Sequence, residues 1–372
     1  MMAKIAEVIQ LMGELAPARL AEDWDNVGLQ VGDASQDVKN ILLALDFNQQ
    51  VLAEAEEKNC QLIITHHPFI FNGIKSINIQ NQNSKLIFEL IKNNISLFSA
   101  HTNLDIAEAG LNDYLIKKLD VENISILKTT SSQNYHKLVT FIPEENFEQV
   151  RDALYAEGAG KYKNYSHSGF YQQGIGNFKP LADSEPYLGE KGSLNEVEEY
   201  RFETIVAPEN LDQVIKELLK VHPYEEPAWD LYQMENLKSK KGIGRIADLK
   251  SEIKLDSFLD KIKEIYKLDL IRVVKAKKKI NRIALCSGSG ADFIRDAHYQ
   301  GADLYLTGDV KYHEAQTAEE LGMSLVDFGH YGSEKFVKEL LFERLISSAF
   351  AKLKKELNFI KSDVNTAPWN YQ

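Results

Sequence analysis

Two adjacent histidines, His66 and His67, directly follow a short apolar run at residues 62–64 and directly precede Pro68. The run predicts a buried strand, and the proline ends it because proline cannot donate to a sheet ladder. Adjacent side chains on a strand normally face opposite sides, but a bend at its end lets both imidazoles reach one site. Open α/β sheets bind ligands at this carboxyl edge. The pair therefore predicts an α/β sheet with a site at a strand end.

Histidine and a carboxylate recur, four residues apart, after two other apolar runs. His101 and Asp105 follow one run, and His330 and Glu334 follow the other. His330 and Glu334 can share one face of a first helical turn, because residues four apart are neighbours there. The strand ends together offer a set of imidazoles and carboxylates: His66, His67, His101, Asp105, His330 and Glu334.

Neutral imidazole and carboxylate ligands suit zinc, iron or manganese. The set is larger than one catalytic zinc ion usually employs, whereas a two-metal site would use it all. The residues thus predict two divalent ions per subunit, zinc foremost, with iron or manganese as alternatives. We interpret Asp105 as bridging two ions rather than capping a helix. We interpret Glu334 as a ligand rather than a glutamate favoured only by the helix dipole.

Other polar residues have roles around the predicted ions. His101 either is a ligand or, the preferred interpretation, orients Asp105 or binds substrate from outside the ligand set. Another strand end carries Asp309, Lys311 and His313. His101 or His313 would carry protons, and Lys311 would neutralise developing charge. Alternatively, Asp309 caps a helix and His313 lies on its surface.

Three further segments each allow a structural and a functional interpretation. The glycine-rich segment 287–290 is interpreted as a tight turn rather than a phosphate cradle. The segment 22–29 combines an aromatic side chain with acids and an amide, which fits either a turn or the edge of a substrate pocket. The segment 222–227 is interpreted as a rigid loop rather than a place where its histidine and acids bind a ligand.

The order of elements predicts a core that is split in sequence. Helix-like and strand-like segments alternate from residue 1 to about 125 and again after about 281, which indicates a mostly parallel sheet with layered helices. The middle has the order β-α-β-β-α-β of a ferredoxin-like α+β domain. We therefore expect an α/β core at 1–126 and 241–372 with a domain inserted at 127–240. Residues 242–279 give only a weak pattern, and a long final helix is expected at about 334–357.

Length and charge narrow the class of protein. A chain of 372 residues is long for one core, so two domains are expected. The net charge of −12 argues against nonspecific binding to nucleic acid or to an anionic membrane. Anionic substrates stay open, because a two-metal centre is locally positive. The first residues read as an amphipathic helix and no apolar stretch reaches about 18 residues, so we expect a cytoplasmic protein.

Five motifs in this order resemble those of the Nif-three-like family, whose members are often labelled GTP cyclohydrolase 1 type 2 homologues. They lie at residues 24–29, 65–68, 101–105, 307–309 and 329–334. The resemblance covers essentially the whole chain and includes the longer bacterial form, whose inserted domain resembles PII and CutA proteins. It implies a toroidal homohexamer with metal sites facing an inner cavity. It also implies a dinuclear site whose ligands fall on His66, His67, Asp105, His330 and Glu334.

Residues and resemblance together favour a metal-dependent hydrolase that acts on a purine nucleotide or another phosphate-containing substrate. Metal-activated water would attack the substrate, with GTP as one candidate. The alternative is a regulatory protein that binds metal or a small effector without catalysis. This alternative rests on the analogy of the inserted domain to effector-binding folds.

Overall fold

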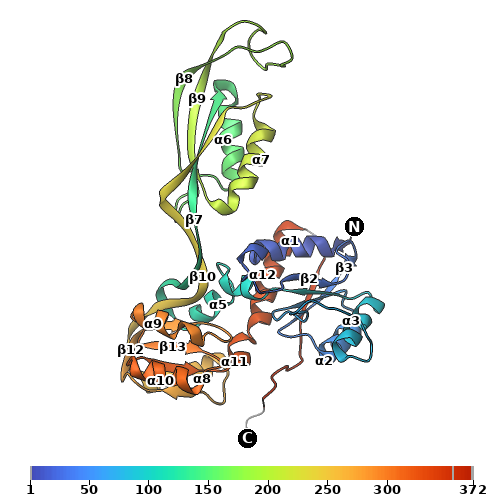
Figure 1. Ribbon diagram of the computed structural model, residues 1–372, viewed down its shortest axis with the longest axis vertical. Coiled ribbons are helices and arrows are strands. Elements are labelled where there is room, and N and C mark those ends of the chain that lie inside the picture. Colours follow the sequence, from blue (N-terminus) through green and yellow to red (C-terminus); the bar gives the residue numbers. More distant parts are fainter. Residues whose placement is uncertain (1, 354–355, 370–372) are drawn as a thin grey trace. The chain divides into compact units, whose positions relative to one another are not determined.

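The computed structural model describes residues 2–353 and 356–369. It consists of two compact units, an α/β core formed by Met1–Thr130 and Lys241–Gln372, and an insert formed by Ser131–Lys240. Figure 1 shows the core built from both ends of the chain, blue and red. The chain leaves the core along the long strand β7 (Val121–Pro143) and returns along β10 (Trp229–Lys254). The mixed α/β class expected from the sequence is confirmed.

The first half of the core forms a five-stranded sheet in the order β15-β4-β5-β6-β2. Strands β4 (Asn40–Ala44), β5 (Leu62–Thr65) and β6 (Ser96–Ser99) are parallel, and β15 (Asn358–Lys361) joins them in parallel from the far end of the chain. Strand β2 (Gly28–Val31) closes the edge antiparallel to β6. The carboxyl ends of β5 and β6 therefore lie side by side, which brings the residues after each strand together.

Helices cover both faces of this first sheet. Helices α2 (Gln49–Glu57) and α3 (Gln82–Lys92) pack on one face through an apolar cluster that includes Leu42, Leu52 and Leu90. Helices α1 (Ile5–Leu15), α5 (Leu111–Lys117) and α12 (Val337–Lys352) contribute to the cluster on the other face. The side chain of Asn48 caps α2 by accepting from the Gln50 and Val51 amides, which fixes where this helix begins.

The second half of the core forms another sheet, in which β11, β14, β13 and β12 precede the core portions of β10 and β7. Strands β12 (Lys279–Leu285), β13 (Leu304–Thr307) and β14 (Ser324–Asp327) are parallel, and β11 (Arg272–Val274) is antiparallel to β14. Helices α9 (Ile294–Tyr299) and α10 (Tyr312–Glu320) pack on one face. The region with the weak sequence pattern supplies helix α8 (Leu255–Tyr266) on the other face.

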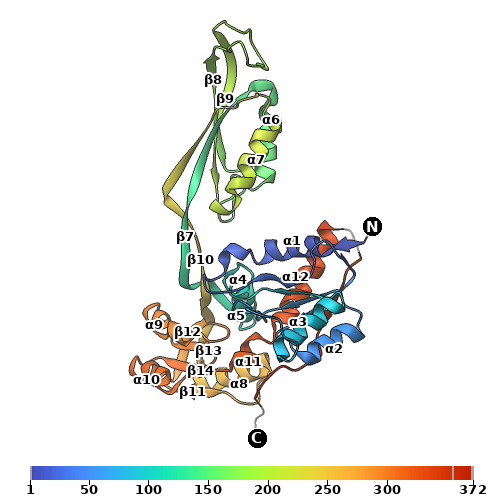
Figure 2. The ribbon, with the colours of Figure 1, turned by 45° about the vertical axis from the view of Figure 1, so that its right-hand side comes forward.

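One continuous apolar cluster joins the two halves of the core. It contains buried side chains of the first sheet, such as Ile64, together with Leu285 and Val326 of the second. Figure 2 shows the short helices α4 (Thr102–Ile106), α5 and α11 (His330–Glu334) between the two sheets. The strand ends of both sheets can therefore contribute to one site.

The prediction of one long final helix at 334–357 is wrong in its bounds. Helix α11 ends at Glu334, and α12 begins at Val337 and ends at Lys352. Between them Lys335 and Phe336 form a turn that keeps near-helical backbone angles, and the buried Phe336 packs against Tyr266 with ring centroids 5.9 Å apart. Residues 354–355 of the expected helix lie outside the described residues. The break places Glu334 at the end of a short helix rather than at the start of a long one.

The insert is an antiparallel sheet with two helices. Its strands lie in the order β10-β7-β9-β8, with β8 at Gly169–Phe178 and β9 at Asn195–Val206. Helices α6 (Phe147–Ala156) and α7 (Leu211–Val221) pack on the sheet through a separate apolar cluster that includes Val150, Phe202 and Val214. The chain order β-α-β-β-α-β with this strand order is the ferredoxin-like arrangement that the sequence predicts. The finer likeness to PII and CutA proteins stays a prediction.

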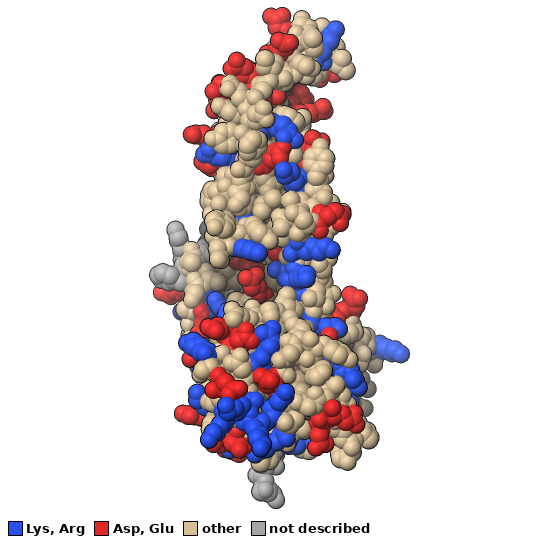
Figure 3. Space-filling view, turned by 90° about the vertical axis from the view of Figure 1, so that its left-hand side faces the viewer, with Lys and Arg blue, Asp and Glu red and all other residues tan. Residues whose placement is uncertain are grey.

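The surface carries both signs of charge. On the face drawn in Figure 3, acidic and basic side chains are interspersed. None of the helices within the described residues combines the length and the apolar character needed to cross a bilayer.

Candidate metal centre

A bend after β5 brings His66 and His67 to the same side of the sheet. The backbone amides of both residues donate to one acceptor, the carbonyl oxygen of Leu45, at 3.1 and 3.0 Å. Leu45 follows the neighbouring parallel strand β4, so the bend is fixed by the strand beside it. The strict alternation of side chains ends here. The ring centroids of the two imidazoles lie 5.3 Å apart.

The Nδ1 atom of each of three histidines is already engaged. His66 Nδ1 lies 2.8 Å from the carbonyl oxygen of Ala100. His67 Nδ1 lies 2.6 Å from Asp46 Oδ1, and His330 Nδ1 lies 2.7 Å from Asp309 Oδ2. Such contacts fix both the tautomer and the ring orientation of a metal-binding histidine. Each imidazole is thereby left with Nε2 free to face its neighbours.

The three Nε2 atoms converge on two carboxylates. His66 Nε2 lies 3.7 Å from Asp105 Oδ1 and 3.7 Å from Glu334 Oε1. Glu334 Oε2 lies 2.8 Å from His67 Nε2 and 2.9 Å from His330 Nε2. The two latter nitrogens are 3.3 Å apart. We call these five residues the candidate metal centre.

The donor set fits metal ions. His66 is fully buried, and its Nε2 has no hydrogen-bond partner among the described residues. Two atoms that ligate one tetrahedral ion lie roughly 3.4 Å apart, close to the separations around His66 Nε2. The ligand atoms of His66, His67 and His101 lie within 4.8 Å of one another, as do those of His67, His330 and Glu334. These two groups, which share His67, could each hold a metal ion.

The ionisable groups of the centre shift one another's pKa values. Burial raises the pKa of Asp105, and the nearby Glu334 carboxylate adds to this effect. Burial also opposes ionisation of Glu334, but contacts with His330, His66 and His67 hold its pKa well below the ordinary value. Burial disfavours the charged form of His67, yet Asp46 and Glu334 raise its pKa to about 10. Such buried charges require compensation, which protons or cations can supply.

The loop after β12 supports both carboxylates. Ser287 Oγ donates to Asp105 Oδ1 at 3.0 Å, and the Gly288 amide donates to Ser333 Oγ at 2.9 Å. The amides of Ser287 and Gly290 also donate to protein side chains, so they are not available to a phosphate. Gly288 has a φ of +62°, and a Cβ there would lie 2.3 Å from Glu334 Oε1. The glycine-rich segment 287–290 is thus a tight turn packed under the centre.

His101 lies beside the centre and is held by Asp25, a contact that the sequence did not predict although Asp25 lies in the segment left open between a turn and a pocket edge. His101 Nδ1 lies 3.0 Å from Asp25 Oδ1, and the Asp25 side chain is fully buried. Burial raises the pKa of Asp25, but contacts with His101 and Thr102 lower it to about 2. Trp24 packs edge-on against the His101 ring at 6.0 Å. The segment 24–29 therefore borders the centre and orients one of its imidazoles.

Asp46 is another residue that the sequence reasoning missed. Its carboxylate joins His67 to Thr366 Oγ1, so it ties the centre to the end of the chain. A signal was present, because Asp46 follows β4, the parallel neighbour of β5, and so lies at the same sheet edge. Asp309 follows β13 and holds His330, which agrees with the role around the metals considered for it.

Lys311 and His313 are not brought to the centre. Both are at the first turn of α10, which directs them to solvent. The Lys311 side chain is 84% exposed, and its Nζ lies 3.9 Å from Glu314 Oε1. His313 Nδ1 lies 2.9 Å from Gln316 Oε1 of the same helix. The roles expected for these two residues, charge neutralisation and proton transfer, therefore have no support in their positions.

The comparisons with known proteins match nearly the whole length of this chain. The family model described as Duf34/NIF3 (NGG1p interacting factor 3) matches residues 3–368. A protein of Bacillus subtilis named GTP cyclohydrolase 1 type 2 homolog is 38% identical over 366 residues, 98% of each chain. A protein of Listeria innocua with the same name is 39% identical over 368 residues, again 98% of each chain. The crystal structure of a Bacillus cereus protein related to NIF3 superposes with a TM-score of 0.92 at 36% identity, covering 100% of both chains.

Proposed function

The chain belongs to the Duf34/NIF3 family, and from that premise we propose that it is a metal-dependent hydrolase with two divalent ions per subunit. His66, His67, Asp105, His330 and Glu334 would hold the ions. Zinc is the first candidate, with iron or manganese as alternatives, because imidazole and carboxylate donors suit all three. The substrate would be a purine nucleotide or another phosphate-containing molecule. The name of the relatives, GTP cyclohydrolase 1 type 2 homolog, makes GTP the first substrate to test.

One observation carries the proposal. Within the described part of the chain, His66 Nε2 is buried without a hydrogen-bond partner and lies 3.7 Å from both Asp105 and Glu334. A buried polar atom without a partner costs free energy, so natural structures almost always give it one. The distance is too long for a hydrogen bond and suits two donors of a shared cation. A second group of donors around His67 supports a second ion.

A pair of divalent ions would supply water activation near neutral pH and stabilise negative charge on the substrate. The chain's own residues supply orientation and proton transfer. Asp46 and Asp309 hold the imidazoles of His67 and His330 in place. His101 would accept or deliver a proton through Nε2, because its Nδ1 is bonded to Asp25. The site would thus combine a rigid metal centre with one additional acid–base group, His101.

The alternative proposal is a regulatory protein that binds metal or a small effector without catalysis. The ferredoxin-like insert favours it by analogy with effector-binding folds, and none of the five residues of the candidate metal centre belongs to the insert. We also propose self-association into the toroidal homohexamer implied by the family resemblance, which light scattering on the purified chain would test.

The first experiment is elemental analysis of the untagged protein, followed by hydrolysis assays with GTP and a phosphodiester panel, each with and without chelator. We expect two equivalents of metal and turnover that the chelator abolishes. His67→Ala and Glu334→Ala should each lose at least one equivalent. His313→Ala is the matched control, because His313 lies at the surface outside the centre and should keep both equivalents.

Full metal content in both variants would refute the site. Two equivalents without turnover of any substrate would favour the regulatory alternative over the hydrolase.

A further inference from the structure

A cavity of about 1050 Å³ opens onto one side of the candidate metal centre. His67 and His330 form part of its wall. The rest comes from the segment after α8 (267–270), from β11, from the end of β14, and from residues 365–369 near the end of the chain. Ligand pockets typically measure about 300–1,000 Å³, so this cavity suits a molecule of nucleotide size.

We propose that this cavity binds a phosphate-bearing ligand with a planar ring, and that Lys335 holds its anionic group while the metal centre faces its reactive part. The inference rests on the proposed function and deepens it, because it names the residues that would select the substrate.

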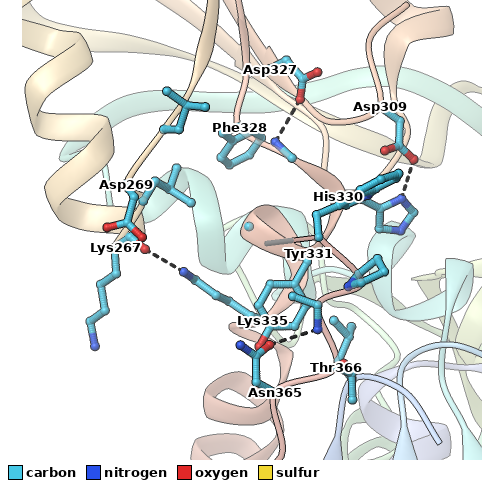
Figure 4. A pocket seen from close by; sticks show the side chains of 18 of the residues that line it. Lys267, Asp269, Asp309, Asp327, Phe328, His330, Tyr331, Lys335, Asn365 and Thr366 are labelled. Atoms are coloured by element: carbon cyan, nitrogen blue, oxygen red, sulfur yellow. Dashed lines mark hydrogen bonds and ion pairs between the residues drawn. The ribbon is translucent and has the colours of Figure 1, made fainter. Parts of the chain in front are cut away.

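Lys335 is the basic residue that the geometry singles out. It is half-buried, and its Nζ donates to the carbonyl oxygen of Lys267 at 2.9 Å. Figure 4 shows its side chain reaching along the cavity toward the main chain at Lys267. Within the described part of the chain, no carboxylate forms an ion pair with Lys335. An ammonium group has three donors, so at least one remains for a ligand in the cavity.

The acidic residues of the cavity wall are mostly engaged elsewhere. Asp46 and Asp309 hold the histidines of the centre, and Asp327 accepts from Arg272. The charged groups nearest to Lys335 are Lys267, Asp269 and Glu339. A negatively charged group of a ligand would therefore meet the Lys335 ammonium, whose Nζ is bonded to a main-chain carbonyl, as the cation at this end of the cavity.

Aromatic side chains line the same space. Tyr331 projects into it from α11, and Trp369 contributes an indole that is 76% exposed. An exposed indole face can stack on a planar ring, which is a common mode of base recognition. The cavity thus offers a cation for a phosphate group and an aromatic surface for a ring.

The test is isothermal titration calorimetry on the untagged, metal-loaded full chain with GTP, tripolyphosphate and guanosine. We expect GTP to bind more tightly than tripolyphosphate, and guanosine to bind weakly. Lys335→Gln should weaken GTP and tripolyphosphate binding about tenfold or more, because it removes a charged hydrogen bond. Lys335→Arg should retain most of the affinity.

Lys311→Gln is the matched control, because Lys311 is an exposed lysine outside the cavity wall, and the affinities of this variant should equal those of the wild type. Trp369→Ala should weaken GTP binding and leave tripolyphosphate unchanged. Equal affinities for guanosine and GTP, or wild-type affinities in Lys335→Gln, would overturn the inference. Unchanged GTP affinity in Trp369→Ala would overturn its ring contact.

Metal content and turnover measured on the same samples separate the two proposals. Chelator-sensitive turnover with a silent Lys335→Gln substitution would leave the hydrolase standing and remove this pocket assignment. If GTP binding depends on Lys335 but no turnover occurs, the pocket assignment would stand and the hydrolase proposal would be removed.

Discussion

Asp25 Oδ1 lies 3.0 Å from His101 Nδ1, and the other oxygen of the same carboxylate accepts from the Thr102 amide at 3.0 Å. One buried carboxylate thus orients the imidazole and also caps the short helix that carries Asp105. Because the proton on Nδ1 points at Asp25, Nε2 keeps its lone pair toward the metal centre. The pair is an orienting device comparable in logic to the Asp–His pair of hydrolytic triads.

Asp25→Asn should reverse the tautomer of His101, because an amide can donate to Nδ1 and so force the proton onto Nε2. We expect the ¹⁵N shifts of the His101 imidazole to exchange between the two ring nitrogens. Turnover should fall about 10–100-fold, the usual cost of losing a partner that orients a site histidine. Metal content should stay at the wild-type level.

Thr102→Val is the matched control for Asp25→Asn. It removes a hydroxyl that donates to the same carboxylate but leaves the contact between Asp25 and His101. The ¹⁵N shifts should then stay as in the wild type. An unchanged tautomer in Asp25→Asn would show that Asp25 does not orient His101.

Gly288→Ala should damage the metal centre without removing any ligand. The added Cβ would lie 2.3 Å from Glu334 Oε1 and 3.5 Å from His330 Nε2, so the carboxylate must move. Elemental analysis and competition with a chelator should show lower metal content or affinity, by about tenfold or more, the scale seen when ligand support is lost.

Gly322→Ala separates this effect from backbone strain. Gly322 has a φ of +65°, close to that of Gly288, but has open space around its Cβ position. Both substitutions should destabilise the fold by about 1–2 kcal/mol, since both force an L residue into the left-handed region. If both variants bind metal like the wild type, Glu334 does not depend on the loop for its position.

The residues of the candidate metal centre could be singled out from sequence because each follows a local pattern. A buried strand that ends in a histidine is visible without any tertiary information, and the spacing of His330 and Glu334 is that of one helical turn. The alternation of elements likewise gave the α/β class and the ferredoxin-like order of the insert.

The partners of those ligands could not be predicted with equal ease. Asp46 and His67 are 21 residues apart, and Asp25 and His101 are 76 apart, so only the sheet order brings them together. The position of Lys311 gives its expected role no support for a related reason. Lys311 is near Asp309 in sequence, but the first turn of α10 points it to solvent, whereas Lys335 enters the cavity where α11 ends.

Arg245→Met should destabilise the core strongly. Arg245 donates from Nε and Nη2 to the two oxygens of Asp113 at 2.8 Å each, and both side chains are buried. Its removal leaves a buried carboxylate without its cation, which typically costs about 3–5 kcal/mol. Urea denaturation should show this loss in the free energy of unfolding.

Two comparisons test the cause of that loss. Replacing both partners, Arg245→Met with Asp113→Leu, should recover most of the stability because no unpaired charge remains. Lys250→Met removes an exposed ion pair with Asp120 and should change stability little. A double variant as unstable as the single one would mean that packing, and not charge pairing, is the main role of Arg245.

Stability should fall as the pH drops below the ordinary pKa of histidine, with His222 as one cause. His222 is buried in the insert, where Nε2 donates to the Phe141 carbonyl and Nδ1 accepts from the Tyr224 amide. Burial lowers the pKa of His222, although the bond to Phe141 opposes this.

A lowered folded-state pKa means that the unfolded chain takes up the proton first as the pH falls below 6.5, the ordinary value. The stability due to the neutral imidazole is therefore complete above that pH and declines below it. His222→Gln should lose about 1–3 kcal/mol of stability near pH 7.5, because a flexible amide replaces the rigid ring whose two nitrogens make the buried hydrogen bonds. The difference in Tm between wild type and variant should narrow toward pH 5, measured by calorimetry on the full chain.

His298→Gln, which alters a histidine of the core helix α9, serves as the control for general effects of pH. A difference between wild type and His222→Gln that stays constant with pH would show that His222 does not titrate differently in the folded state.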